Sequence, residues 1–411
     1  MKKLLFMIVA VVMLFTACDN KPEHIYDDHS ADLVGTWTCL TENYAEALII
    51  NADGTAVSYG VEDGEYWENV RGTVVTEGGN ITMTFEDNDN LTGHFDIIPG
   101  MAFSLFEDSG ERYVYQYCAN DLSDEIVGMW VCNDGPSDKE TDMVIQTFNE
   151  DGTVNKTGWS VASNEFIVKE TIAYKVVGDL IFHQRPSDMV IEGVAPHFAS
   201  KLTYMPNASQ LGDMLTNTAI KLVNGQAIEL SMSMLRIKQT LELPGMKYDY
   251  IKTFVTNVKG EDKDIPFLNT SFNFAKMDGS IIDKFLKSIL FTVEFPEANK
   301  IKYSYLLEGQ NVVIEAPIEV EGNKMTIKMS ANNPAYQDVD MYAFQDQDNT
   351  QMHWYMYTTS FEKFFANTSV ALLLGYGQLD KDDTEGIANV YKTIADAVES
   401  INLSLVMSKA K

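Results

Sequence analysis

Two stretches of the sequence are near copies of each other and decide the fold. Residues 33–39 read Leu-Val-Gly-Thr-Trp-Thr-Cys, and residues 126–132 read Ile-Val-Gly-Met-Trp-Val-Cys. Each copy is followed by the motif Asn-x-Asp-Gly-Thr, at residues 51–55 and 149–153. Asp-Gly between two apolar runs is a strong hairpin signal, with both turn positions expected at φ > 0. Two matching motifs in the same order indicate duplicated modules.

A third and fainter module lies further along the chain. Residues 291–303 have the same strand-turn-strand pattern, and the hairpin at 318–327 parallels the one at 174–182. Apolar and polar residues alternate in 228–232 and again in 401–405, as expected of strands with one buried face. The second and third modules therefore share an ending as well as a hairpin.

Four segments have apolar residues at the spacing of a helix: 211–222, 281–289, 361–374 and 387–398. The third of these is unusually apolar, and we expect it to be buried or to lie across an open barrel mouth. Elsewhere short alternating runs and turn residues recur every 8–12 residues, which favours sandwiches or antiparallel barrels over βαβ units. The sequence predicts a mainly β protein with a few short helices, most of them added to the C-terminal module.

The amino terminus has the organisation of a secretory signal peptide. A Met-Lys-Lys start precedes an apolar run over 4–15, and a small-residue pair stands directly before Cys18. The run is shorter than the about 20 residues that a membrane-spanning helix needs. The residues before Cys18 resemble a bacterial lipobox, which implies removal of 1–17 and acylation of Cys18, for example with palmitate. The alternative is simple secretion with Cys18 as an unmodified thiol.

The composition and charge of the chain indicate an acidic tether and argue against nucleic acid as a partner. Residues 18–31 are polar and acidic and contain a proline, so we expect a flexible tether between lipid and folded body. The whole chain has 30 basic and 60 acidic residues. This surplus repels phosphate backbones, so nucleic acid is not expected as a partner. We expect a cell-envelope lipoprotein of the outer membrane, and the pair Asp27-Asp28 loosely resembles signals that send lipoproteins to the cell surface.

The Gly35-x-Trp37 motif on a first strand, followed by antiparallel hairpins, resembles the lipocalins and the wider calycin superfamily. Together with the lipobox it resembles the lipocalin-like lipoproteins of Bacteroidota. The resemblance implies tandem eight-stranded barrels in which Trp37 and Trp130 close one end. Barrels of that size have an interior that is filled by side chains or holds one small ligand.

The expected organisation has five parts. A lipoprotein signal peptide at 1–17 and the tether at 18–31 precede three lipocalin-like modules. These modules are expected at 32–120, at 121–240 and at 241–411, the last with inserted helices.

The sequence gives little sign of catalysis, redox chemistry or metal binding. Cys39, Cys118 and Cys132 follow Cys18, and an odd number allows at most one disulfide. We expect buried thiols, with a Cys39–Cys118 disulfide as the alternative. GxSxG, P-loop, GxGxxG, HExxH and CxxC motifs are absent, and the acidic clusters lack the spacing of an EF-hand. We therefore expect no catalytic residues, no metal and no cofactor.

Two functions follow from this pattern. Aromatic residues such as Trp67, Tyr113, Tyr115 and Trp159 lie in expected strands, where one face would line an amphipathic cavity or form a packed core. The first function is a non-catalytic envelope lipoprotein, held at the membrane by its lipid, that binds a small hydrophobic or amphipathic ligand. The alternative is a structural or interaction lipoprotein with packed barrels that binds envelope proteins.

Overall fold

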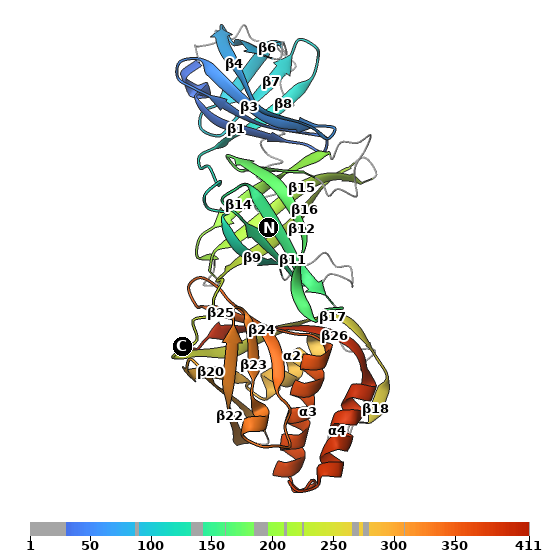
Figure 1. Ribbon diagram of the computed structural model, residues 1–411. Coiled ribbons are helices and arrows are strands. Elements are labelled where there is room, and N and C mark those ends of the chain that lie inside the picture. Colours follow the sequence, from blue (N-terminus) through green and yellow to red (C-terminus); the bar gives the residue numbers. More distant parts are fainter. Residues whose placement is uncertain are drawn as a thin grey trace. The chain divides into compact units, whose positions relative to one another are not determined.

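Most strands of the molecule form three closed, eight-stranded antiparallel barrels (Figure 1), and two more form a small separate sheet. This computed structural model describes residues 30–86, 90–132, 143–160, 162–184, 196–208, 212–223, 226–264, 271–273, 279–307 and 309–410. The signal peptide and Cys18 lie outside these residues, as does nearly all of the tether. The predicted fold class is confirmed. No helix in the described ranges is long and apolar enough to cross a membrane.

Barrel 1 is a compact unit of its own that ends at Asn120. The 3-10 helix η1 (Ser30–Leu33) precedes it, and each strand pairs with the next until β8 pairs with β1 and closes the sheet. Its strands are β1 (Gly35–Leu40), β2 (Tyr44–Ile50), β3 (Thr55–Glu62), β4 (Glu65–Glu77), β5 (Asn80–Phe85), β6 (Asn90–Ile98), β7 (Ala102–Glu107) and β8 (Arg112–Cys118).

Barrel 2 repeats this order, with β16 closing on β9. Its strands are β9 (Gly128–Cys132), β10 (Val144–Phe148), β11 (Thr153–Ser160), β12 (Glu165–Val177), β13 (Leu180–Gln184), β14 (His197–Met205), β15 (Met214–Val223) and β16 (Gln226–Ile237). The helix predicted at 211–222 is wrong, because this segment forms β15. The neighbouring strands β14 and β16 both pair with it, and its threonines and isoleucine favour a strand.

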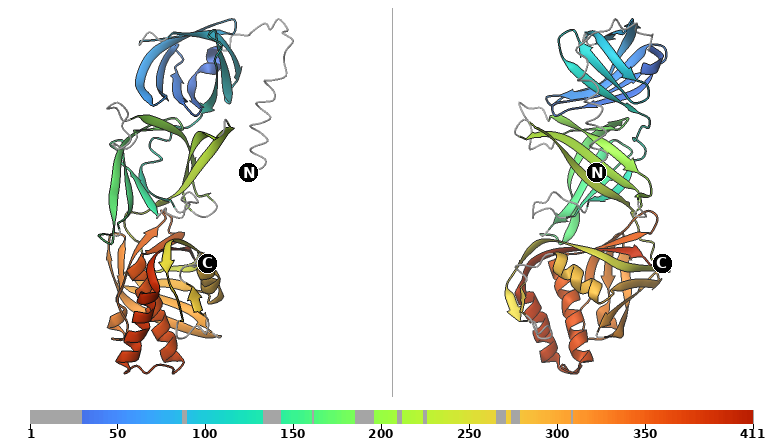
Figure 2. Two further views of the ribbon diagram at one scale, coloured as in Figure 1. Left: turned by 90° about the vertical axis from the view of Figure 1, so that its right-hand side faces the viewer. Right: turned by 180° about the vertical axis from the view of Figure 1, so that it is seen from behind.

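Barrel 3 carries the helical additions (Figure 2). Its strands are β17 (Met246–Gly260), β20 (Thr292–Glu297), β21 (Lys300–Leu307), β22 (Gln310–Glu321), β23 (Lys324–Ile327), β24 (Val339–Gln345), β25 (Gln351–Met356) and β26 (Val398–Lys409). The added elements are β18 (Asp262–Asp264), β19 (Ser271–Asn273), α2 (Gly279–Ser288), η5 (Met329–Ala331), α3 (Thr358–Gly375) and α4 (Thr384–Ala397). The three helices expected in this module are therefore confirmed.

Helix α3 is buried, as its apolar sequence predicts. Phe361, Val370 and Leu373 belong to the core of barrel 3, and α3 packs beside α4 and against β26 (Figures 1 and 2). Asp383 caps α4, because its carboxylate accepts a hydrogen bond from the Gly386 backbone N–H (2.8 Å). Residues 401–407 of β26 are all buried. Leu403 and Leu405 belong to the same core as α3, whereas Ser404 pairs with Tyr355, which belongs to the hydrophobic cluster shared with barrel 2.

The two Asn-x-Asp-Gly-Thr motifs form the same turn. In 51–55 and in 149–153 the asparagine amide donates to the threonine hydroxyl (2.9 and 3.0 Å). The aspartate accepts from the threonine backbone N–H (3.0 Å in both). Only the glycines, Gly54 (φ 79°) and Gly152 (φ 78°), have positive φ, so the expectation that both central positions do so is wrong. The hairpin itself is confirmed, with the longer loop in which glycine takes the left-handed position.

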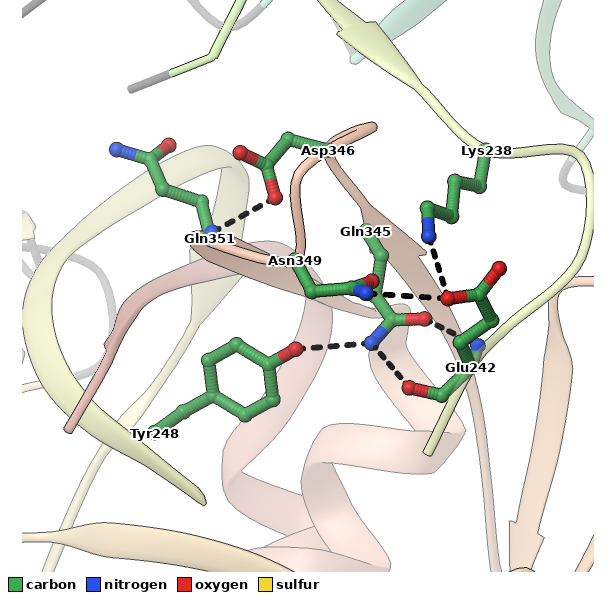
Figure 3. Close-up of polar contacts among 7 residues, drawn as sticks. All are labelled: Lys238, Glu242, Tyr248, Gln345, Asp346, Asn349 and Gln351. Carbon is green, nitrogen blue, oxygen red and sulfur yellow. Dashed lines mark hydrogen bonds and ion pairs between the residues drawn. The ribbon is translucent and has the colours of Figure 1, made fainter. Parts of the chain in front are cut away.

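Barrels 2 and 3 belong to one unit, and their connection is held against the β24–β25 hairpin (Figure 3). The Gln345 side chain accepts from the Glu242 backbone N–H and donates to the Glu242 carbonyl (2.9 Å). The same amide donates to the Tyr248 hydroxyl (2.8 Å). The Glu242 carboxylate pairs with Lys238 (2.7 Å) and accepts from Asn349 (3.1 Å). One set of side chains thus fixes the end of barrel 2 to barrel 3.

Aromatic packing strengthens this junction. Trp159 of barrel 2 stacks on Tyr357 of barrel 3, with ring centroids 4.4 Å apart. The Phe166 and Tyr342 rings pack edge to face, with centroids 4.9 Å apart. All four residues belong to a hydrophobic cluster drawn from both barrels. Trp159 therefore serves the junction and does not line a barrel interior.

Cys39 and Cys118 are buried thiols that are not joined by a disulfide. Cys118 pairs across the sheet with Thr36, three residues before Cys39. A strand rises about 3.3 Å per residue, so the two cysteines are further apart than the roughly 4.4–6.8 Å between Cα atoms that a disulfide spans. The structure thus has the buried thiols that the sequence favours and not the Cys39–Cys118 disulfide, and Cys132 in barrel 2 is buried as well.

Candidate functional site

Barrel 1 contains a cavity of about 590 Å³ whose lining comes from every strand except β1. Binding sites for small molecules commonly have volumes of about 300–1,000 Å³. The inner wall is formed by aromatic, sulfur-containing and aliphatic side chains around one buried carboxylate, that of Glu46. Exposed acids of the β3–β4 turn, Glu62, Asp63 and Glu65, line it as well and form a rim towards the solvent.

Alternation along β2 places Glu46 inside the barrel. Tyr44, Leu48 and Ile50 all pack with the core of barrel 1. Because successive side chains of a strand point to opposite faces, Glu46 shares the inward face with these three residues. Its side chain is only 6% exposed.

Uncharged groups surround the Glu46 carboxylate. Ser58 on β3 donates to Oε1 (2.6 Å), and the Tyr44 hydroxyl donates to Oε2 (2.6 Å). The Tyr115 hydroxyl on β8 also donates to Oε2. Ser58 in turn accepts from the Trp67 indole N–H on β4 (2.8 Å). Four strands therefore contribute to one hydrogen-bonded group around a buried acid.

The tyrosines of this group are held in their neutral form. Burial, reinforced by the negative charge of Glu46, raises the pKa of Tyr44 and of Tyr115 well above the usual range. Both hydroxyls therefore stay protonated and donate to the carboxylate at neutral pH. The same causes, burial first and Glu46 second, raise the pKa of the Cys39 thiol to about 12. Cys39 is therefore not a nucleophile at neutral pH.

Aromatic rings form much of the cavity wall. The Tyr44 ring lies 5.0 Å from the Tyr113 ring and 6.1 Å from the Trp67 ring, centroid to centroid. Gly60 stands between Glu46 and Trp67 in the sheet, paired with each of them. A Cβ at Gly60 would lie 2.0 Å from Cζ2 of Trp67, so the indole occupies the space that the glycine leaves.

The tryptophans predicted to close the barrels lie in the cores and not in this cavity. Trp37 and Trp130 are fully buried. Each indole N–H donates to the carbonyl four residues earlier, that of Leu33 (2.6 Å) and that of Ile126 (2.7 Å). This shared bond is a further sign of duplication, and the closing role of both residues stays a prediction.

Sequence reasoning found part of the cavity and missed its centre. The sequence leaves Trp67, Tyr113 and Tyr115 either lining a cavity or packed in a core, and all three line the cavity. Nothing in the sequence motifs identifies Glu46 or Ser58. The available signal was one acid at an inward position in the apolar segment 44–50.

Metal binding finds no support in the part of the chain that the structure describes. No group of three or more His, Cys, Asp or Glu side chains there is arranged to hold a metal ion. The acidic cluster at 380–383 supplies the cap of α4, and Asp346 accepts from the Gln351 backbone N–H (2.8 Å). The cluster at 86–89 lies mostly outside the described residues.

Comparisons with known proteins identify no family. No family model and no curated protein matches the sequence. One similar solved structure is a double mutant of the vaccine antigen Transferrin Binding Protein B from Haemophilus parasuis Hp5, at 11% identity and a TM-score of 0.24. The match covers 90% of this chain and 66% of that one, slightly less than two thirds. A porin-like protein from Bacteroides uniformis ATCC 8492 has 9% identity and a TM-score of 0.13, over 48% of this chain and 94% of that one. Likenesses this weak assign no function.

Proposed function

We propose that the protein is an exported, lipid-anchored lipoprotein of the cell envelope that binds a small amphipathic ligand in barrel 1, without catalysis. The observation that carries the ligand-binding part is the cavity of about 590 Å³ with aromatic walls and one buried carboxylate. The signal peptide and Cys18 carry the anchoring part, and the acidic tether would hold the barrels away from the lipid surface. An outer-membrane location, with the barrels on the cell surface, belongs to the same proposal.

A second function, binding of an envelope protein, is favoured by a different surface. The β15–β16 hairpin exposes Val223 (42%), Ile228 (40%) and Leu230 (53%). Apolar side chains gathered on one exposed hairpin are typical of a contact with another protein. This function does not need the cavity, so the two can be separated by experiment.

The anchor is tested by Cys18→Ala in the full chain, produced in an exporting cell. The expected wild-type protein partitions into detergent and carries the mass of acyl chains. The expected variant stays in the aqueous phase without that mass, because burial of acyl methylenes at about 0.8 kcal/mol each holds the protein at the membrane. Partition of the variant into detergent would contradict lipidation at Cys18.

The ligand is tested by native mass spectrometry of this soluble Cys18→Ala chain, before and after solvent extraction. We expect an extra mass that leaves on extraction. Val70→Trp, on the cavity wall, should abolish it, whereas Val75→Trp, on the outer face of the same strand and 62% exposed, should retain it. An extra mass that survives Val70→Trp would place the ligand elsewhere. A chain without extra mass would favour the protein-binding function.

A further inference from the structure

We infer that the ligand of the barrel 1 cavity is an organic cation: an ammonium group joined to an apolar alkyl or aryl body. This inference rests on the proposed function, because it names the chemical class that the cavity takes. It draws on the charge, the aromatic walls and the apolar lining of the cavity.

The buried charge has no counterion from the protein. Glu46 is 6% exposed, and no ion pair among the described residues includes it. Its three hydrogen bonds come from hydroxyl groups, which orient the carboxylate but leave its charge uncompensated. A buried carboxylate is costly unless a cation accompanies it. The cavity beside it offers the place for one.

The surroundings strengthen the same sign of charge. The described lining includes Glu62, Asp63, Glu65 and Glu107 and no lysine, arginine or histidine. Residues 32–120 contain two basic residues against sixteen acidic ones. A pocket lined by one sign of charge raises the local concentration of ligands of the opposite sign, so this cavity attracts cations and repels anions.

The side chains that line the cavity favour an organic cation over a metal ion. The Tyr44 ring lies beside the Trp67 ring and beside the Tyr113 ring, and all three residues line the cavity. Aromatic rings bind an ammonium group through the cation–π interaction. Met83 and Phe85 supply an apolar surface that a hydrated metal ion would not use. The described acids also do not converge into a metal-binding group. Calcium is the metal ion that acidic side chains would bind instead, so the experiment below includes it as a competitor.

The experiment titrates the full Cys18→Ala chain with three probes of similar size, by calorimetry at low salt. They are benzyltrimethylammonium, its neutral isostere neopentylbenzene and the anion benzoate, and each titration follows solvent extraction of the protein. We expect the cation to bind at least tenfold more tightly than the isostere, with no binding of benzoate. Calcium chloride at 1 mM (on the order of extracellular calcium affinities) should not displace the cation.

Two matched variants assign the effect to the cavity. Glu46→Gln keeps the shape and the hydrogen-bond acceptor but removes the charge, and should weaken cation binding at least tenfold. Glu77→Gln removes the same charge from the exposed far end of β4 and should leave the affinity unchanged. Should Glu46→Gln fail to fold, Glu107→Gln on the partly exposed lining gives the same test, with a smaller expected loss of about threefold.

The outcomes separate this inference from the proposed function. Equal affinity for the cation and its neutral isostere, with loss of both in Val70→Trp, would overturn the inference and leave a ligand-binding cavity. Displacement of the cation by calcium would overturn it in favour of a metal site. Failure of every probe to bind, together with a chain that carries no extractable mass, would overturn the proposed function as well.

Discussion

At the scale of single residues, the protein keeps polar groups in interiors where apolar ones would pack more simply. Glu46 in barrel 1 and His183 in barrel 2 are both nearly fully buried. Glu46 is surrounded by hydroxyl donors beside a cavity, whereas His183 stacks on Phe198 at 5.0 Å between ring centroids. In the described structure the Nδ1 atom of His183 has no hydrogen-bond partner. The acid has the environment of a binding group, and the histidine has that of a core residue.

His183 gives a prediction for stability against pH. Burial lowers its pKa to about 3, and burial lowers that of His353 to about 4, both from 6.5. Below pH 6.5 the unfolded chain binds protons at these residues and the folded chain does not. The free energy of unfolding therefore decreases by about 1.4 kcal/mol per histidine for each unit by which the pH is lowered. His183→Phe should remove about 2 kcal/mol of the loss between pH 7 and pH 5 for the unit of barrels 2 and 3. Urea unfolding at the two pH values measures it, and an unchanged pH dependence in the variant would contradict the burial of a neutral histidine.

At the scale of elements, a glycine on β3, Gly60, leaves the space that the Trp67 ring of β4 occupies in the cavity wall. Gly60→Ala would drive a methyl group into the Trp67 ring, displace the indole and break its hydrogen bond to Ser58. We expect a loss of stability of about 1–3 kcal/mol, a shift in tryptophan fluorescence and weaker binding of benzyltrimethylammonium. Gly158→Ala is the matched control, at the same distance from the Asp-Gly-Thr turn of barrel 2. Its nearest neighbour would be the Lys169 side chain at 3.4 Å.

The control should keep the stability and the affinity of the unaltered chain. An unchanged fluorescence spectrum and affinity in Gly60→Ala would contradict the placement of Trp67 over Gly60. The pair of variants thus separates the close approach in barrel 1 from the general effect of adding a methyl group to a strand.

Element type could be predicted wherever local pattern and tertiary pairing agree. The apolar spacing of 387–398 predicts a helix, and α4 forms there with an Asp383 cap. The same spacing in 211–222 predicts a helix that does not form, because two long neighbouring strands complete their hydrogen bonds with this segment. Periodicity reports which side chains are apolar, and the competition between helix and sheet is decided by partners far away in the sequence.

At the scale of the whole molecule, the duplicated motifs made the fold predictable. They did not allow the cavity to be predicted. The repeated Gly-x-Trp and Asn-x-Asp-Gly-Thr motifs specify the same strands and turns in barrels 1 and 2. Whether a barrel interior is filled depends on the summed volumes of side chains from all its strands, which no short motif records. The carboxylate of Glu46 likewise accepts hydrogen bonds from Ser58 and Tyr115, which lie 12 and 69 residues away in the chain.

Crystallography would show directly whether an organic cation lies inside barrel 1. Crystals of the Cys18→Ala chain grown with 4-bromobenzyltrimethylammonium would locate the probe through the anomalous signal of bromine. We expect a bromine peak inside barrel 1, with the ammonium group beside Glu46 and against the Trp67 and Tyr44 rings. Bromine found only outside barrel 1, or an interior filled by the barrel's own side chains, would contradict it.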